Sequence, residues 1–194
     1  VSPKQHQMAT GYINYAFTKN TRMGVELAAS KDDINRFSTK DKRNDDGAAA
    51  KFFLDHRQAL NKNKADGWDF IASLQTEMND EKFRPVEVYR SVEFARDWNT
   101  GTLLTFDKEL LSNVQVGLSQ AKTGDMKYGF RSLFRGNSYR GLMHTLNGNV
   151  HPGKWTAKWD ASLLSSDGPV FESTFLRHRD EITRSFGSWV PGIR

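Results

Sequence analysis

Apolar and polar residues alternate along most of this chain, which is the pattern of β-strands that have one apolar and one polar face. The first case places Gly11, Ile13, Tyr15 and Phe17 on one face and Tyr12, Asn14, Ala16 and Thr18 on the other. After a turn at Lys19-Asn20-Thr21, residues 22–29 alternate in the same way. The two segments therefore predict a β-hairpin.

The same alternation recurs to the end of the chain. It predicts further strands at residues 48–55, 68–78, 86–98, 102–107, 113–121, 126–135, 139–149, 155–164, 170–179 and 182–189. Short turns join most of them, which requires antiparallel neighbours, because a parallel crossover needs about a dozen residues or more. Residues 30–47 are rich in Lys, Asp, Arg and Asn and predict a long solvated loop. We expect one all-β domain over residues 1–194, an antiparallel meander of roughly 10 to 12 strands.

Such strands can form a barrel, or part of one, in which the apolar face meets lipid and the polar face lines the interior. They can also form a β-sandwich, in which the apolar faces of two sheets meet. Strand lengths near 9 to 11 residues and Trp and Tyr near strand ends favour the barrel. Gly117, Gly129 and Gly141 lie among polar-face positions, which suits a crowded interior. Arg90 and Arg96 count against a barrel, because residues 86–98 place them on an apolar face and a lipid-facing Arg costs about 2 to 4 kcal/mol.

The composition limits the kinds of partner and site that are expected for this chain. Hydrophobic residues make up 37% and aromatic residues 12%, which is enough for a folded chain. The absence of cysteine excludes disulfides and thiolate metal sites. The net charge of +5 is mild, and 28 basic residues are interspersed with 23 acidic ones, so nucleic acid is not an expected partner. The N-terminus lacks the apolar core of a signal peptide, although a mature chain or an excised fragment has lost its signal.

Residues 89–99, Tyr-Arg-Ser-Val-Glu-Phe-Ala-Arg-Asp-Trp-Asn, are similar to a segment of large surface proteins of Bacteroidota. The succession of hairpins also resembles bacterial outer-membrane β-barrels. The resemblance implies an outer-membrane or cell-surface location without implying an activity. The chain departs from the barrel pattern by ending in Pro191-Gly192-Ile193-Arg194 rather than on an aromatic strand, which a fragment of a larger barrel would explain.

We therefore expect a non-enzymatic envelope protein with a structural, transport or assembly role, whose partners are outer-membrane lipid or other envelope proteins. The alternative is a soluble β-sandwich, secreted or periplasmic, that binds carbohydrate or another surface partner.

A glycoside hydrolase is a further alternative, because Glu87, Glu93 and Asp97 would share one face of a strand at residues 86–98. The plainer interpretation is that these carboxylates form cross-strand ion pairs. The bases expected to face them are Lys127, Arg131, Arg135 and Lys158. The five histidines lack the spacing of metal ligands, so neither a metal nor a cofactor is expected.

Flat aromatic side chains suggest a second kind of site. These side chains could stack on sugar rings or could pack in a core or a membrane girdle. They are Trp68, Trp98, Trp155, Trp159 and Trp189, with Tyr128 and Tyr139 nearby. The candidate binding residues are Trp155, Trp159, Tyr128, Arg131, Glu93 and Asp97. No catalytic residue is expected.

Overall fold

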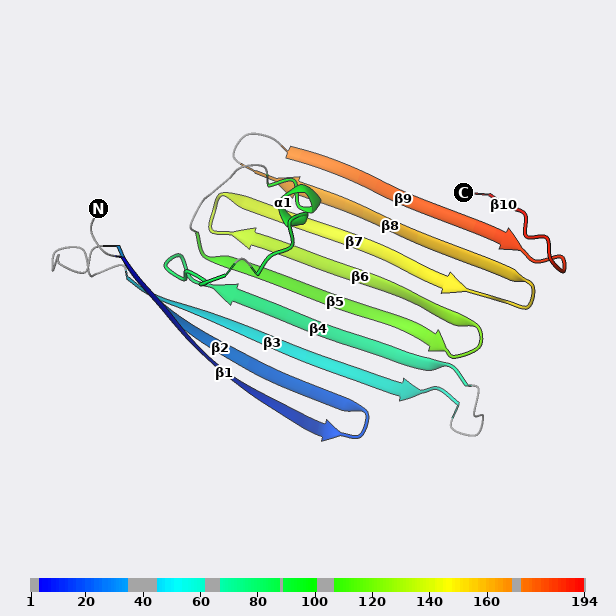
Figure 1. The fold of residues 1–194 in the computed structure, drawn as a ribbon, viewed down its shortest axis with the longest axis horizontal. Coiled ribbons are helices and arrows are strands. Elements are labelled where there is room, and N and C mark those ends of the chain that lie inside the picture. Colours follow the sequence, from blue (N-terminus) through cyan, green and yellow to red (C-terminus); the bar gives the residue numbers. More distant parts are fainter. Residues whose placement is uncertain are drawn as a thin grey trace.

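The computed structural model is a single ten-stranded antiparallel sheet in which every strand pairs with its neighbour along the chain (Figure 1). It describes residues 4–34, 45–61, 67–87, 89–100, 107–168 and 172–193. The strands are β1 Gln5–Thr18, β2 Thr21–Asp33, β3 Asp46–Ala59, β4 Asp69–Asn79, β5 Glu109–Gln120, β6 Gly124–Arg135, β7 Tyr139–Val150, β8 Trp155–Asp167, β9 Glu172–Arg184 and β10 Gly192–Ile193. The all-β antiparallel prediction is confirmed.

The sheet is open. β1 forms one edge, and β9 with the two-residue β10 forms the other, so the sheet is not closed into a barrel. The ten strands that the structure describes all belong to this one sheet, which leaves no second sheet to form a sandwich. None of the helical residues described forms a helix that is long and apolar enough to span a membrane.

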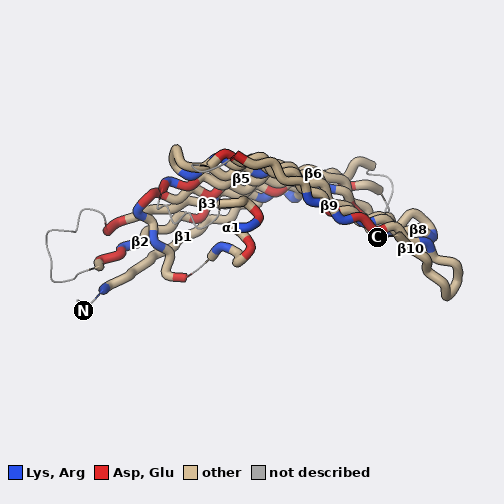
Figure 2. Tube along the Cα trace, turned by 90° about the horizontal axis from the view of Figure 1, so that it is seen from above, with Lys and Arg blue, Asp and Glu red and all other residues tan. Residues whose placement is uncertain are grey.

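The strand predicted at residues 86–98 is wrong. Its second half holds α1, the four-residue helix Phe94–Asp97. The reason lies in the neighbouring strands, because β4 and β5 pair directly from Asn79 with Glu109 to Asp69 with Ser119. The chain between them therefore cannot form a strand between β4 and β5, and α1 lies over one face of the sheet instead (Figure 1, Figure 2).

Other strand boundaries also differ from the sequence prediction. β2 continues to Asp33 and β3 begins at Asp46, so the loop predicted at residues 30–47 is shorter than expected. The strand predicted at residues 102–107 lies outside the described residues except for Asp107. The predicted last strand is in part the end of β9, and Phe186 and Trp189 form only an isolated bridge.

The strand register gives the two faces of the sheet opposite characters. One face carries rows of apolar partners, such as Tyr15, Met23, Leu54, Leu74, Val114 and Phe130. The other face carries rows such as Arg22, Asp55, Ser73 and Gln115. Seen from above, the sheet is arched and α1 lies on its concave side (Figure 2). Since Trp98 contacts polar-face positions, the polar face is the concave one and the apolar face is convex.

The buried apolar residues lie on the concave side. They are Phe94, Trp98, Leu111, Leu133, Tyr139, Met143 and Leu164. This small core sits between α1 and strands β5 to β8. No described segment covers the convex face in this way, and Ile13 and Leu176 there are 75% and 63% exposed. In antiparallel sheets with one packed face the apolar face is usually the covered one, whereas here α1 covers the polar face (Figure 2).

Candidate functional site

The chain between β4 and β5 forms the candidate site, because it lies across the concave face and meets charged side chains of the sheet. We call residues 80–100 the crossing segment; residue 88 within it is not described. Near its start, the backbone N–H of Arg84 donates to Ser30 Oγ at 2.9 Å, and the Arg84 carbonyl contacts His6 Nε2 at 2.8 Å. A Cβ on Gly47 would collide with the Phe83 backbone, so glycine lets the crossing segment lie close to β3.

The other end of the crossing segment is anchored by Trp98, which is fully buried. An ideal Cβ on Gly141 would lie 2.9 Å from Trp98 Cε3, so only a glycine leaves room for the ring there. The Tyr139 hydroxyl donates to the Trp98 carbonyl oxygen. The Arg131 guanidinium lies 5.3 Å from the centre of the Trp98 ring, within the range of a cation–π contact.

Between these two ends, Arg90 connects the crossing segment to two strands. Its guanidinium pairs with Glu77 of β4 at 2.7 Å and with Glu109 of β5 at 2.5 Å. Glu109 also pairs with Arg135 of β6 at 2.7 Å, and Glu77 lies 3.8 Å from Lys51 of β3. The result is a chain of alternating charge across four strands, which we call the ion-pair chain: Lys51, Glu77, Arg90, Glu109 and Arg135. The side chains of Arg90, Glu77 and Glu109 are only 19%, 15% and 12% exposed, so solvent screens these pairs weakly.

Aromatic rings cover the ion-pair chain. The Arg90 guanidinium lies 4.7 Å from the centre of the Tyr89 ring and 4.8 Å from that of Phe94. Arg135 lies 5.7 Å from the centre of the Phe94 ring. These contacts keep the paired charges away from water, which strengthens each pair.

Burial and charge shift two pKa values in the crossing segment. Burial raises the pKa of Tyr89, and the hydrogen bond from Asn79 Nδ2 to its hydroxyl oxygen, together with the charge of Arg90, acts in the opposite direction. Burial alone would lower the pKa of Arg90, but the combined attraction of Tyr89, Glu109 and Glu77 raises it. The ion-pair chain therefore favours the charged form of Arg90.

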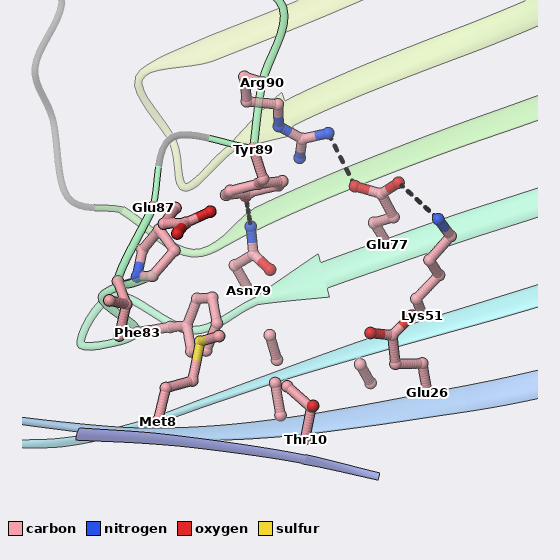
Figure 3. A pocket seen from close by; sticks show the side chains of 15 residues that line it. Met8, Thr10, Glu26, Lys51, Glu77, Asn79, Phe83, Glu87, Tyr89 and Arg90 are labelled. Carbon is pink, nitrogen blue, oxygen red and sulfur yellow. Dashed lines mark hydrogen bonds and ion pairs between the residues drawn. The ribbon is translucent and has the colours of Figure 1, made fainter. Parts of the chain in front are cut away.

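A cleft of about 670 Å³ lies between strands β1 to β4 and the crossing segment (Figure 3). Met8 and Phe83 give it an apolar wall, while Glu26 and Glu87 contribute carboxylates. Lys51 and Arg90 reach it from the ion-pair chain. Among the residues that the structure describes, no group of three His, Asp or Glu side chains is arranged to hold a metal ion.

The residues predicted from sequence as a binding site do not come together. The register places Trp155, Trp159 and Tyr128 on the convex face and Arg131 on the concave face. Glu93 and Asp97 lie in the crossing segment, at α1. A joint site of these six residues has no support in their positions.

The two tryptophans of β8 also differ from each other. Trp159 lies against Gly148, where any Cβ would collide with its ring, and its indole nitrogen is buried with no partner among the described residues. Trp155 is 45% exposed, and the Arg184 guanidinium lies 4.9 Å from its ring centre. The Tyr128 hydroxyl is 2.7 Å from His144 Nδ1. Whether these rings bind a sugar stays a prediction.

Residues 86–98 do not form a strand, so the prediction that Glu87, Glu93 and Asp97 share a strand face is wrong. Glu93 pairs with Arg96 at 2.6 Å, and Asp97 pairs with Arg177 at 3.2 Å. Glu87 lines the cleft instead. Of the bases expected to face these carboxylates, Arg131 is near enough to Asp97 for the two charges to interact. The other three have other acidic neighbours, because Lys127 pairs with Asp125, Arg135 with Glu109 and Lys158 with Glu181.

Sequence reasoning missed the ion-pair chain, and a signal for it was available. Arg90, Phe94 and Trp98 are spaced four residues apart, which is the spacing of side chains on one side of a helix. The same residues also satisfy a two-residue period, so the alternation alone could not distinguish a strand from a helical turn. The acidic partners of Arg90 stand in β4 and β5, and only the sheet register brings them together.

Comparison with protein-family models, with curated proteins and with solved structures finds no match for this chain. The function has to be inferred from its geometry.

Proposed function

We propose that this chain is part of the β-sheet wall of a bacterial outer-membrane or envelope protein, with a structural, transport or assembly role and no enzymatic activity. In this proposal the convex face meets lipid and the concave face lines a polar interior. The observation that carries it is that exposed apolar side chains are concentrated on the convex face of strands that are long enough to cross a bilayer.

Large exposed apolar side chains cover the convex face from β1 to β9. They are Ile13, Tyr15, Phe17, Val25, Leu27, Met78, Val114, Val116, Met126, Tyr128, Leu146, Trp155, Leu163, Leu176 and Ile182. On the concave face of the strands, only Met8, Tyr12 and Phe175 are large, apolar and exposed among the described residues. A continuous apolar surface of this extent marks a contact with lipid or protein, because it would aggregate in water.

Charged residues of the convex face support lipid as the contact. Within the strands they lie toward strand ends: Lys31, Asp33, Asp46, Arg140, Asp167, Glu172, Asp180 and Arg184. The middle rows, such as the one through Val114 and Phe130, carry no Asp, Glu, Lys or Arg. A charge on a lipid-facing strand costs about 2 to 4 kcal/mol at the midplane but about 0 to 1 kcal/mol near the interface. A lipid-facing surface is therefore expected to lack charged residues in the middle of its strands and to tolerate them near the strand ends.

The length of the strands and the position of the Arg90 side chain agree with the proposal. β1 to β9 contain 11 to 14 residues each, at least the length with which a tilted strand crosses a bilayer. Arg90, which a strand at residues 86–98 would have exposed to lipid, lies instead in the ion-pair chain on the concave side. A polar interior is the environment that such a chain of paired charges requires.

A nitroxide scan of β6 in lipid vesicles tests the proposal. The chain contains no cysteine, so single-cysteine variants can be labelled at one position at a time. Tyr128, Phe130 and Phe134 should be relaxed by oxygen, which partitions into lipid. Lys127 and Arg131 provide the matched positions on the concave face and should resist it.

Two results would contradict the proposal. One is equal oxygen accessibility on both faces of β6. The other is a chain that stays folded and monomeric in buffer without detergent, because a lipid-facing apolar surface would then have aggregated.

A further inference from the structure

The free edge of β1 is the longest unpaired backbone edge among the described strands. β1 has 14 residues, and all of its residues from His6 to Thr18 are exposed. It pairs with β2 on one side and with no described strand on the other. Its sequence, QHQMATGYINYAFT, contains no Asp, Glu, Lys, Arg or Pro.

Edge strands of natural proteins normally carry protection against pairing with other chains, in the form of charge, proline, bulges or short length. β9, the opposite edge, has such protection, since it carries Glu172, Arg177, Arg179, Asp180, Glu181 and Arg184 and is capped by β10 at one end. In β1 the only irregularity lies between Ala16 and Thr18, next to the turn. The contrast between the two edges shows that β1 is the unprotected one.

We infer that the free edge of β1 pairs with an antiparallel strand supplied by polypeptide outside residues 4–193. β1 directs Ile13, Tyr15 and Phe17 to the convex face, and Thr10, Tyr12 and Asn14 to the concave face. The incoming strand therefore carries apolar residues at alternate positions on the convex side and polar residues on the concave side, as β2 does. Such pairing supplies hydrogen-bond partners for the backbone groups on the free edge of β1, which the hydrocarbon core of a bilayer cannot supply.

Strand direction excludes two other partners. β1 and β9 run in the same direction, because they are separated by an even number of antiparallel pairings. With the apolar faces of both sheets on the same side, pairing β1 with the β9 edge of any copy would thus be parallel, in a sheet that is antiparallel throughout. Antiparallel pairing with that edge would require the second copy to be turned over, so that its polar face continued the apolar face of the first. Pairing β1 with a second β1 is antiparallel but turns the second copy end for end. On the proposed function this would place equivalent loops on opposite sides of the membrane, so this last exclusion rests on that function.

The test uses the full chain in detergent micelles and a labelled synthetic peptide of the β2 sequence, Thr21–Asp33, as the probe strand. β2 already pairs antiparallel with β1, so its pattern suits the free edge. Fluorescence anisotropy should show saturable binding at least about tenfold tighter than that of a scrambled peptide of equal composition. Equal binding of the two peptides would overturn the inference.

Two proline variants locate the binding edge. Successive residues of a strand direct their backbone N–H groups to opposite edges. Of the variants Tyr12→Pro and Ile13→Pro, one therefore loses an N–H that bonds to β2, and the other loses an N–H on the free edge. The variant that keeps its thermal midpoint should lose probe binding by about tenfold or more. Unchanged probe binding in that variant would overturn the inference.

Self-pairing is tested separately by single cysteines at positions 8 to 16. If the yield of disulfide-linked dimer peaks at one of these positions, the strand that pairs with β1 belongs to a second copy of the chain and the inferred partner is wrong. The nitroxide scan of β6 measures lipid exposure independently of the probe peptide. Failure of the edge inference is therefore distinguishable from failure of the proposed function.

Discussion

The indole ring of Trp98 lies against Gly141, and the absence of a side chain at position 141 allows the crossing segment to seat on the sheet. An ideal Cβ there would lie 2.9 Å from Trp98 Cε3 and 2.6 Å from the Tyr139 hydroxyl. Both neighbours belong to the buried set on the concave side. The contact therefore couples the position of the crossing segment to a single backbone site in β7.

Gly141→Ala should loosen the crossing segment. The added methyl overpacks the site, which costs roughly 1 to 3 kcal/mol. Limited proteolysis should then cut between β4 and β5 at least several-fold faster. Gly11→Ala is the matched control, because no atom lies within 4 Å of an ideal Cβ at position 11. Equal proteolysis rates for the two variants would show that Trp98 does not anchor the segment.

Arg90→Gln should destabilise the fold more than the loss of an exposed ion pair does. It removes the shared partner of Glu77 and Glu109, whose side chains are 15% and 12% exposed, and hydrogen bonds to charged groups contribute about 1.5 to 3 kcal/mol. Arg22→Gln is the control, because the Arg22 and Asp55 side chains are 66% and 45% exposed, and such a pair contributes about 1 kcal/mol or less. Denaturant unfolding in micelles measures both changes. A larger loss for Arg22→Gln would reverse the importance assigned to the ion-pair chain.

Tyr89 should titrate above the ordinary tyrosine range, because partial burial raises its pKa although 51% of the residue is exposed. A raised pKa in the folded state means that the stabilising effect of the protonated phenol is complete below the unfolded pKa of about 10 and is lost as the pH rises through the folded pKa. The difference in absorbance at 295 nm between the protein and Tyr89→Phe follows this group alone. Asn79→Ala should raise the pKa further, since the Asn79 amide donates to the Tyr89 oxygen. A lowered pKa in Asn79→Ala would contradict this account.

Arginine should be tolerated on the concave face and resisted on the convex face. In vesicles, Val114→Arg should cost about 2 to 4 kcal/mol, because position 114 lies in a middle row of the convex face. Gln115→Arg should cost well under that amount, because Gln115 faces the polar side opposite Gly129. Urea titration of vesicle-inserted protein gives both values. Equal costs would argue that neither face meets lipid.

The alternation of residue types was sufficient to predict most strands, because burial or lipid exposure of one face imposes a two-residue period whatever the sheet does as a whole. Residues 126–135 illustrate this, since the structure has β6 over Gly124–Arg135 with Phe130 and Phe134 on one face and Arg131 and Arg135 on the other. The period fails at residues 86–98. There the apolar positions also recur every four residues, and the direct pairing of β4 with β5 excludes a strand between them.

The sequence by itself determined the class of fold, the antiparallel order and the opposite characters of the two faces, since each depends on neighbours along the chain or on turn length. Tertiary structure alone decided that the sheet stays open and that Arg90, Glu77 and Glu109 meet. Those ion pairs join residues from the crossing segment and two separate strands, and their meeting depends on the register and curvature of the whole sheet. Local pattern carries no information about either, because the same alternation fits a flat sheet, an arched one or a strand that is never formed.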